Sequence, residues 1–296
     1  NKYLWNLYQK ACTPYEWHRD AFKIAKRYNK IIFSSPFSKR GVDFLEKLKV
    51  PLYKIASFEI TDLKLIKYIA KKNKPIILST GMASLNEINT ALKLIKKYHK
   101  KVVILHCVSG YPTYLEDTNL KRINELKQKF KGFYLGVSDH TQGIASSIAS
   151  TSLGVVAIEK HFKLDGEDCG PDSSFSLSIE ELHELVNECN DAWTAMGNED
   201  FMRAQSEGQN KIFRRSLYFV RHLKKGQTIS EKDIRRVRPG FGLSPKYFDS
   251  VIGRKVNAEV NFGDPVTLSV LDEKLKESLK HVDRSSEKPL RDFDFD

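Results

Sequence analysis

The chain has 296 residues, of which 41% are hydrophobic, and its 49 Lys and Arg against 37 Asp and Glu give a formal net charge of +12. This length suits a large α/β domain with room for a small additional module, and the hydrophobic content supports a real core. No apolar run approaches the ~18 residues that a membrane-spanning helix needs, and no signal peptide is visible, so we expect a cytoplasmic protein without a membrane partner.

The positive charge does not by itself indicate a nucleic-acid-binding protein. The lysines are scattered over helical segments such as KYIAKKNK and LIKKYHKK, and no compact basic block with interleaved aromatic residues is present. Such a surface would also attract a small anionic substrate. The four cysteines are widely spaced and form no CxxC pair, which indicates free thiols in a reducing compartment.

Residues 1–30 contain loop and helix material but no apolar strand. After them, short β-rich runs alternate with helical patterns about every 22–31 residues, which is the size of a βα unit. Because the runs are almost continuously apolar, we expect parallel strands that are buried on both faces. The runs are KIIFSSPF, LYKIASF, PIILSTGM, KVVILHCVS, FYLGVSDH and VVAIEKHF.

The segments between these runs have the pattern of amphipathic helices. Ser84 with Glu87, and Ser178 with Glu181, each form a capping box ahead of an apolar stripe. The segment IASSIASTSLG is rich in small residues, which predicts a helix packed closely against its neighbours. Six βα units are two fewer than a closed (β/α)8 barrel contains, so the fold is either an open α/β sheet or a TIM-type barrel that lacks its first two βα units.

The character of the sequence changes after about residue 200, where short strands and turns replace the βα pattern. We therefore expect two domains joined by a linker. The expected bounds are a partial barrel at 1–197, a polar linker at 198–213, a small β-rich module at 214–272 and a charged, disordered tail at 273–296.

Every predicted strand ends in polar residues, and the carboxyl ends of parallel barrel strands converge on one face. The simpler explanation is the onset of a loop, where Ser and Gly are common. His140 and His161 form the most informative pair, because two imidazoles at neighbouring strand ends could share a divalent cation with positions left open for catalysis. Asp139 and Glu159 could orient these imidazoles. The alternative is that both histidines are hydrogen-bonded structural residues.

Lys54 lies at the end of an apolar run, where a core lysine needs an anionic partner. It is either a fixed cation for a phosphate or carboxylate, or a lysine that pairs with Glu59 or Asp62. The STG motif at 79–81 is suited to hydrogen-bonding an anion. Asp172 follows the last strand, and it either acts at the barrel mouth or forms an N-cap or Asx turn.

Together these segments resemble the sialic acid synthase family, the phosphoenolpyruvate-dependent nonulosonate synthases. The module near the C-terminus is similar to the SAF (antifreeze-like) domain of these enzymes. The matching motifs cover residues 31 to about 270 in order, and they are FSSPF, YKIASFEI, PIILSTGM, HCVSGYPT, GVSDHTQG, AIEKHF, GPDSSFSL, RRSL and RPGFGLSP.

The resemblance implies that C3 of phosphoenolpyruvate attacks the aldehyde of an open-chain N-acetylated amino sugar, while water adds at C2 and phosphate leaves with C–O cleavage. It also implies a divalent metal, Mn²⁺ or Mg²⁺, that polarises the aldehyde and is bound by His140 and His161. Arg238 matches an arginine that the SAF domain extends into a partner subunit's barrel, which implies a domain-swapped homodimer. The positions that match phosphoenolpyruvate contacts are Lys54, Ser57, Ser79 and Ser138, and those around the sugar and the reacting centre are Glu59, Tyr111 and Asp172.

Two family motifs have no match here: a glutamate in an E-x-x-x-N-H-N-G-like stretch on the first strand, and a K-x-Q pair on the second. This agrees with two missing strands and implies a truncated chain, so a non-catalytic remnant is the alternative to an active synthase. LYQKACTPYEWH and Ser173 most resemble pseudaminic acid synthases, which implies a 2,4-diacetamido-2,4,6-trideoxy hexose as substrate. Legionaminate synthesis, or N-acetylneuraminate synthesis from an N-acetylhexosamine, are the alternatives.

Overall fold

The computed structural model describes residues 5–6, 8–9, 12–166 and 170–271, and the chain divides into two compact units, Asn1–Asn198 and Glu199–Asp296. The tail expected to be disordered at 273–296, and Cys169, lie outside the described residues. Cys12, Cys107 and Cys189 are free thiols, as their spacing predicted. Within the described ranges, no helix combines the length and apolar character required to cross a membrane.

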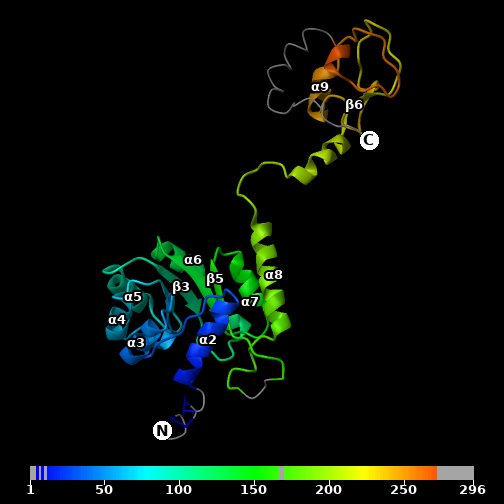
Figure 1. Ribbon diagram of the computed structural model, residues 1–296. Coiled ribbons are helices and arrows are strands. Elements are labelled where there is room, and N and C mark those ends of the chain that lie inside the picture. The colour runs from blue at the N-terminus through cyan, green and yellow to red at the C-terminus, as the bar shows by residue number, and fades with distance from the viewer. Residues whose placement is uncertain (1–4, 7, 10–11, 167–169, 272–296) are drawn as a thin grey trace. The chain divides into compact units, whose positions relative to one another are not determined.

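The first unit is built on a curled sheet of five parallel strands in the order β1-β2-β3-β4-β5 (Figure 1). Each strand pairs with the next one in sequence, which is the order of a (β/α) barrel. The register places Ile104 beside Leu78 on one side and Leu135 on the other, so apolar side chains align across the sheet. The strands are β1 Tyr53–Ile55, β2 Ile76–Ser79, β3 Val102–Cys107, β4 Tyr134–Asp139 and β5 Ala157–Lys160.

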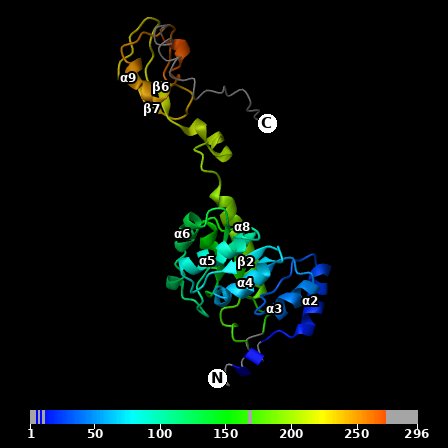
Figure 2. The same cartoon turned by 90° about the vertical axis from the view of Figure 1, so that its left-hand side faces the viewer.

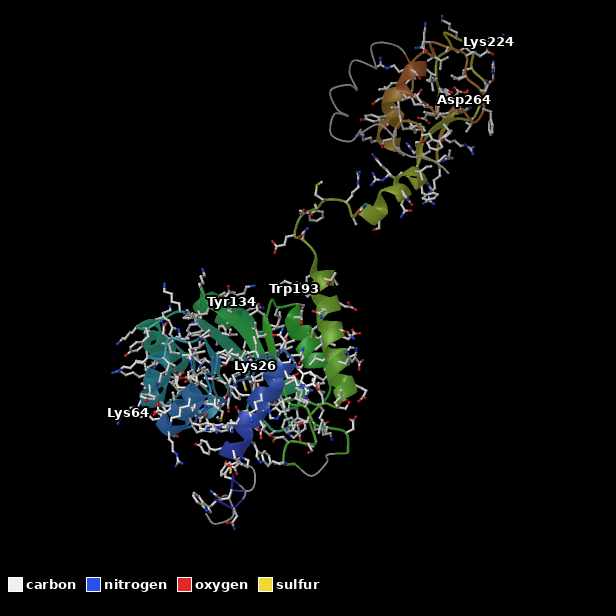
Figure 3. All side chains as sticks on the ribbon, viewed as in Figure 1. Lys26, Lys64, Tyr134, Trp193, Lys224 and Asp264 are labelled. Carbon is white, nitrogen blue, oxygen red and sulfur yellow. The ribbon has the colours of Figure 1, made fainter. Side chains whose placement is uncertain are left out.

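Helices alternate with these strands and cover the sheet (Figures 1 and 2). Neighbouring helices pack in sequence order, α4 against α5 and α7 against α8. Basic residues are spread over different helices, with Lys26 on α2 and Lys64 on α4 (Figure 3). The helices are α2 Tyr15–Arg27, α3 Lys39–Lys47, α4 Leu63–Ala70, α5 Leu85–Lys96, α6 Arg122–Lys129, α7 Ala145–Thr151 and α8 Ile179–Met196.

The helix starts agree with the sequence patterns. Both predicted capping boxes are confirmed: Ser84 caps α5 with Glu87, and Ser178 caps α8 with Glu181. Such a cap satisfies backbone N–H groups that the first helical turn leaves unpaired. The small-residue helix α7 buries its serines, including Ser147 at 0% exposure, which confirms its close packing against the neighbouring helix.

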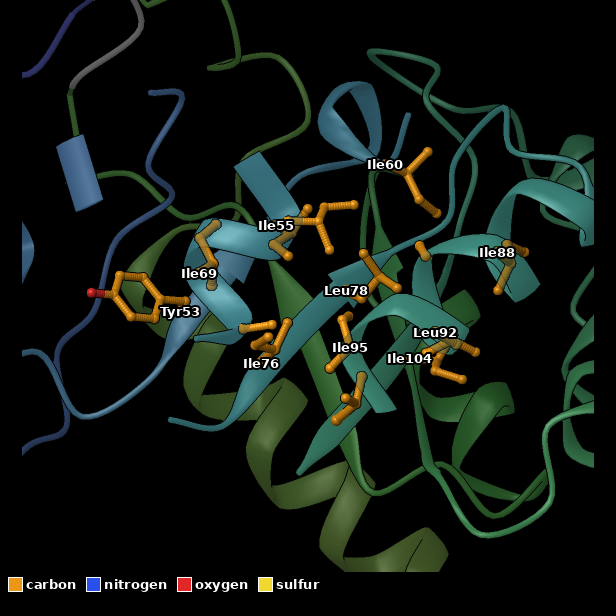
Figure 4. Close-up of a cluster of buried hydrophobic side chains, with 14 of the residues drawn as sticks. Tyr53, Ile55, Ile60, Ile69, Ile76, Leu78, Ile88, Leu92, Ile95 and Ile104 are labelled. Atoms are coloured by element: carbon orange, nitrogen blue, oxygen red, sulfur yellow. The ribbon is translucent and has the colours of Figure 1, made fainter. Parts of the chain in front are cut away.

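The core of the first unit lies between the sheet and its helices (Figure 4). Ile55, Ile76 and Leu78 from the strands meet Ile69 of α4 and Ile95 of α5, and all of these side chains are at most 2% exposed. Each fully buried side chain of this size stabilises the fold by about 1.5–3 kcal/mol. The strand positions, and therefore the strand ends, are fixed by this packing.

The predicted strand KIIFSSPF does not form, and that prediction is wrong. Residues 30–36 belong to no strand, and Ile31 and Phe37 are 75% and 68% exposed. A strand is stable only when its backbone groups pair with a neighbour, and no described strand pairs with this segment. The sheet consequently has open edges at β1 and β5, so it is half of a barrel rather than a closed one. That two βα units are absent from the chain stays a prediction.

The second unit has a small β-rich core of its own. Strands β6 (Ser216–Phe219) and β7 (Ile234–Val237) pair antiparallel, and the short helix α9 (Phe248–Val251) packs nearby. Lys224 and Asp264 in Figure 3 lie on its turns. Short 3-10 segments complete the chain at η1 Ser57–Glu59, η2 Leu115–Asp117, η3 Gln205–Glu207, η4 Gln209–Phe213, η5 Pro245–Tyr247 and η6 Leu268–Val270.

Candidate active site

The carboxyl ends of β1 and β4 meet at Glu159 on β5. Lys54 Nζ donates to Glu159 Oε1 at 2.9 Å, and Ser138 Oγ donates to the same oxygen at 2.7 Å. Lys54 is 8% exposed and Ser138 is 4% exposed, so both donors are largely withdrawn from water. A cation and a hydroxyl group thus already converge on one anionic oxygen, an arrangement that suits recognition of a phosphate or carboxylate.

A second polar group surrounds the loop after β2. Ser57 Oγ accepts from the backbone N–H of Gly81 at 3.0 Å and donates to Cys107 Sγ at 3.5 Å. A Cβ at Gly81 would lie 2.1 Å from Ser109 Oγ and 2.8 Å from Ser57 Oγ, so this close approach requires glycine. The buried hydroxyl of Ser79 has no hydrogen-bond partner among the described residues, which leaves it available to a ligand.

The two predicted histidines lie together, with ring centres 5.3 Å apart. The Nδ1 of His140 lies 3.0 Å from the carbonyl oxygen of Val108, and when it donates there the Nε2 atom is left as the acceptor. His161 Nδ1 lies 3.4 Å from Asp172 Oδ2. Burial lowers the pKa of His161 and so favours the neutral imidazole, the form that binds metal ions. Burial also opposes the charge of His140, but contacts with Cys107 and Val108 outweigh it and raise the pKa of that group.

Aromatic rings enclose this pair. The ring of Tyr111 lies 4.4 Å from that of His140, and Phe175 lies 5.0 Å from His161. Burial raises the pKa of the Tyr111 hydroxyl, so the phenol stays neutral and can donate a hydrogen bond. Glu59 is half-buried, its Oε2 atom has no partner among the described residues, and burial raises its carboxyl pKa. A carboxyl group in this condition suits proton handling.

Three charged residues have partners that the sequence did not suggest. Lys54 pairs with Glu159, and not with Glu59 or Asp62. Glu159 Oε1 accepts from both Lys54 and Ser138, and among the described residues no hydrogen bond joins Glu159 to an imidazole. The Asp139 carboxylate does not bond to an imidazole, because it accepts hydrogen bonds from Thr141 N–H, Ser147 and Lys160.

Of the two remaining predicted site residues, Asp172 lies beside the imidazole pair and Arg238 lies in the second unit. The carboxylate of Asp172 faces His161, and Ser178 rather than Asp172 caps α8, so the N-cap alternative is wrong. Arg238 is exposed in the second unit, directly after β7. Its loop is held against β6, because Ser216 Oγ donates to the carbonyl of Pro239 and accepts from Gly242 N–H.

Cys107 and Phe175 also lie at the candidate site, although no role was predicted for them. The Cys107 sulfur lies 3.5 Å from Ser57 Oγ and 4.0 Å from His140 Nδ1, so it joins the serine group to the imidazole group. Its position one residue after the polar His106 at a strand end was the available signal. Among the described residues, no three His, Cys, Asp or Glu side chains form a metal-binding cluster.

Comparison with known proteins places these features in a family. A family model described as the NeuB family matches residues 1–201, and one described as the SAF domain matches residues 214–271. Pseudaminic acid synthase of Campylobacter jejuni is 40% identical over 262 residues, covering 88% of this chain and 76% of that protein. N,N'-diacetyllegionaminic acid synthase of the same species is 39% identical over 252 residues, covering 84% and 75%.

A solved structure is also similar to this chain. The N-acetylneuraminic acid (sialic acid) synthetase of Leptospira borgpetersenii, in complex with citrate, has a TM-score of 0.67 and 32% identity, over 71% of this chain and 73% of that one. A βα half-barrel with polar strand ends, followed by a SAF module, thus defines a synthase of the nonulosonic acid class. The chain belongs to the NeuB family, as the resemblance predicted.

Proposed function

We propose that the protein condenses phosphoenolpyruvate with an N-acetylated amino sugar to form a nonulosonic acid, and that the acid is pseudaminic acid. C3 of phosphoenolpyruvate forms the new bond to the sugar aldehyde, water adds at C2, and phosphate leaves as the C–O bond breaks. The observation that carries the proposal is the convergence of Lys54 and Ser138 on one anionic oxygen beside two imidazoles. A phosphorylated carboxylic acid and an aldehyde need these two kinds of group next to each other.

In this proposal, the buried cation of Lys54 holds the anionic groups of phosphoenolpyruvate. Ser57, Ser79 and Ser138 supply hydroxyl donors around it, and the unpartnered Ser79 hydroxyl supports this assignment. Charge-assisted hydrogen bonds in a site withdrawn from water are about twice as strong as neutral ones. These residues would fix the enolpyruvyl carbon for attack.

The residues fit a divalent ion at the imidazole pair. In zinc sites a ligand nitrogen lies about 2.0–2.1 Å from the ion, so two imidazoles on one such ion place their ring centres about 5 Å apart, and those of His140 and His161 are 5.3 Å apart. Two imidazoles leave the remaining positions of the ion open to oxygen ligands, and oxygen ligands are the ones that Mn²⁺ and Mg²⁺ prefer. When bound, the ion would supply Lewis-acid polarisation of the aldehyde.

Tyr111, Asp172 and Glu59 would act on the sugar side. Tyr111 and Asp172 contact the imidazole pair, so they are placed to bind sugar hydroxyl or amide groups close to the aldehyde. Glu59 has a raised pKa and an unpartnered oxygen, which support a role in proton transfer at the reacting centre. Arg238 would reach the sugar from the SAF domain of a second subunit in a domain-swapped homodimer.

The choice of sugar rests on the 40% identity to a pseudaminic acid synthase. The substrate would then be a 2,4-diacetamido-2,4,6-trideoxy hexose. A legionaminic acid synthase at 39% identity supports legionaminic acid as a second candidate product.

The test is phosphate release from phosphoenolpyruvate in the presence of Mn²⁺ and each of several sugars. The panel contains stereoisomers of the 2,4-diacetamido-2,4,6-trideoxy hexose and N-acetylmannosamine, and NMR identifies the product. We expect turnover with the diacetamido sugar that yields pseudaminic acid. Turnover with a different sugar alone would reject the pseudaminate assignment, and no turnover with any sugar would support a non-catalytic remnant.

A further inference from the structure

A buried ion pair lies directly behind the two imidazoles. Lys160 Nζ is 3.0 Å from Asp139 Oδ2, and the side chains are 2% and 1% exposed. It is the most deeply buried of the ion pairs found among the described residues. Asp139 immediately precedes His140 and Lys160 immediately precedes His161. The pair therefore joins the last residues of the two strands that carry the imidazoles.

The strand register explains why the pair has this position. Asp139 on β4 is the direct partner of Lys160 on β5. Side chains alternate between the two faces of a strand, so Ser138 and Glu159 point to the opposite face, where they bond each other. The two strand ends are thus joined on both faces of the sheet, immediately before each histidine.

The pair is also bonded to its surroundings. Asp139 accepts from Ser147 Oγ of α7 at 2.6 Å and from Thr141 N at 2.9 Å, while Lys160 Nζ donates to the carbonyl oxygen of Thr141 at 2.5 Å. Both charged groups therefore hold Thr141, the residue that follows His140. The backbone on each side of that imidazole is fixed by contacts that do not involve a ligand.

We propose that Asp139 and Lys160 are positioning residues that set the separation of His140 and His161, and thereby the affinity for a divalent cation. This inference rests on the proposed function. A buried ion pair gains little net stability over apolar residues of similar volume, so stability alone explains the pair poorly. Groups hydrogen-bonded directly to metal ligands change metal affinity by about 10–100-fold when they are removed, and a pair that holds the backbone beside the ligands should act in the same direction.

The test measures Mn²⁺ binding to the folded chain by electron paramagnetic resonance of the free ion, without any turnover. The variants are Asp139→Asn, Lys160→Met and the double variant, which removes both charges at once. We expect each to raise the Kd for Mn²⁺ by at least about tenfold. The double variant avoids an uncompensated buried charge and therefore keeps a melting temperature closer to that of the parent chain.

Two controls separate positioning from general destabilisation. Glu46→Gln breaks an ion pair of 2.6 Å with Lys74, outside the candidate site, and Ile95→Val weakens the core. Both should lower the melting temperature and leave the Kd for Mn²⁺ within twofold. If the double variant binds Mn²⁺ as tightly as the parent chain, the pair is only structural and the inference is overturned. A parent chain that binds no Mn²⁺ would instead overturn the proposed metal site, and this inference with it.

Discussion

Lys54→Met is the most informative perturbation of the proposed anion site. Methionine keeps much of the apolar stem but removes the ammonium group that lies 2.9 Å from Glu159 Oε1. A hydrogen bond to a charged group contributes about 1.5–3 kcal/mol, and each 1.4 kcal/mol is about a factor of ten in affinity. We therefore expect the KM for phosphoenolpyruvate to rise about 10–150-fold, while the KM for the sugar changes little.

The same substitution leaves the Glu159 carboxylate without its cation. Breaking a fully buried pair costs about 3–5 kcal/mol, but the Glu159 side chain is 36% exposed and water compensates in part. We expect a loss of about 1–3 kcal/mol in unfolding free energy, measured by urea titration. Lys74→Met is the matched control, because Lys74 pairs with Glu46 outside the candidate site.

The KM for phosphoenolpyruvate of each variant is measured from initial rates of phosphate release over a range of phosphoenolpyruvate concentrations. The control should lose stability and keep the parent KM values. If Lys54→Met keeps a KM for phosphoenolpyruvate within twofold of the parent value, Lys54 is a structural partner of Glu159, and the anion site has to be sought elsewhere.

Three further predictions concern other parts of the chain. Ser79→Ala removes a buried hydroxyl that has no described partner, so stability should be unchanged while the KM for phosphoenolpyruvate rises about 2–10-fold. The control Ser150→Ala loses a bond to the Ser147 carbonyl, so it should lower stability and leave that KM unchanged. Burial lowers the pKa of His99, so on acidification the unfolded chain binds a proton that the folded chain excludes. Stability should therefore fall as the pH decreases from about 7 to 5, and over this range the urea midpoint of His99→Gln should fall less than that of the parent chain. Arg238→Ala should raise the KM for the sugar and leave the melting temperature unchanged, and equal sugar kinetics would reject its proposed reach into a partner subunit.

Local patterns in the sequence predicted local structure well. The capping boxes at Ser84 and Ser178 start helices because side-chain and backbone groups three residues apart satisfy each other. The apolar runs from residue 53 onward form parallel strands, and their polar ends gather as expected. The run at 31–37 had the same local pattern and formed no strand, because strand formation depends on a partner that local sequence does not specify.

Ion pairs between residues far apart in the sequence could not be predicted. Lys54 pairs with Glu159, 105 residues away, although Glu59 and Asp62 are close in sequence. The choice depends on how β1 and β5 face each other across a curled sheet, which no spacing along the chain encodes. The cation that pairs with Asp139 was not predicted for the same reason, because Lys160 is on the neighbouring strand.

Strand alternation joins these observations into one physical account of the site. On β4 and β5, the residues that point to one face are Ser138 and Glu159, which bond each other and, through Glu159, Lys54. The next residue on each strand, Asp139 and Lys160, points to the other face and binds its partner there. A shift of the β4–β5 register by one residue would separate both pairs at once, and the imidazoles with them. The contacts around Glu159 and the buried ion pair therefore specify the same register, so the geometry of the candidate site and the pairing of its strands depend on each other.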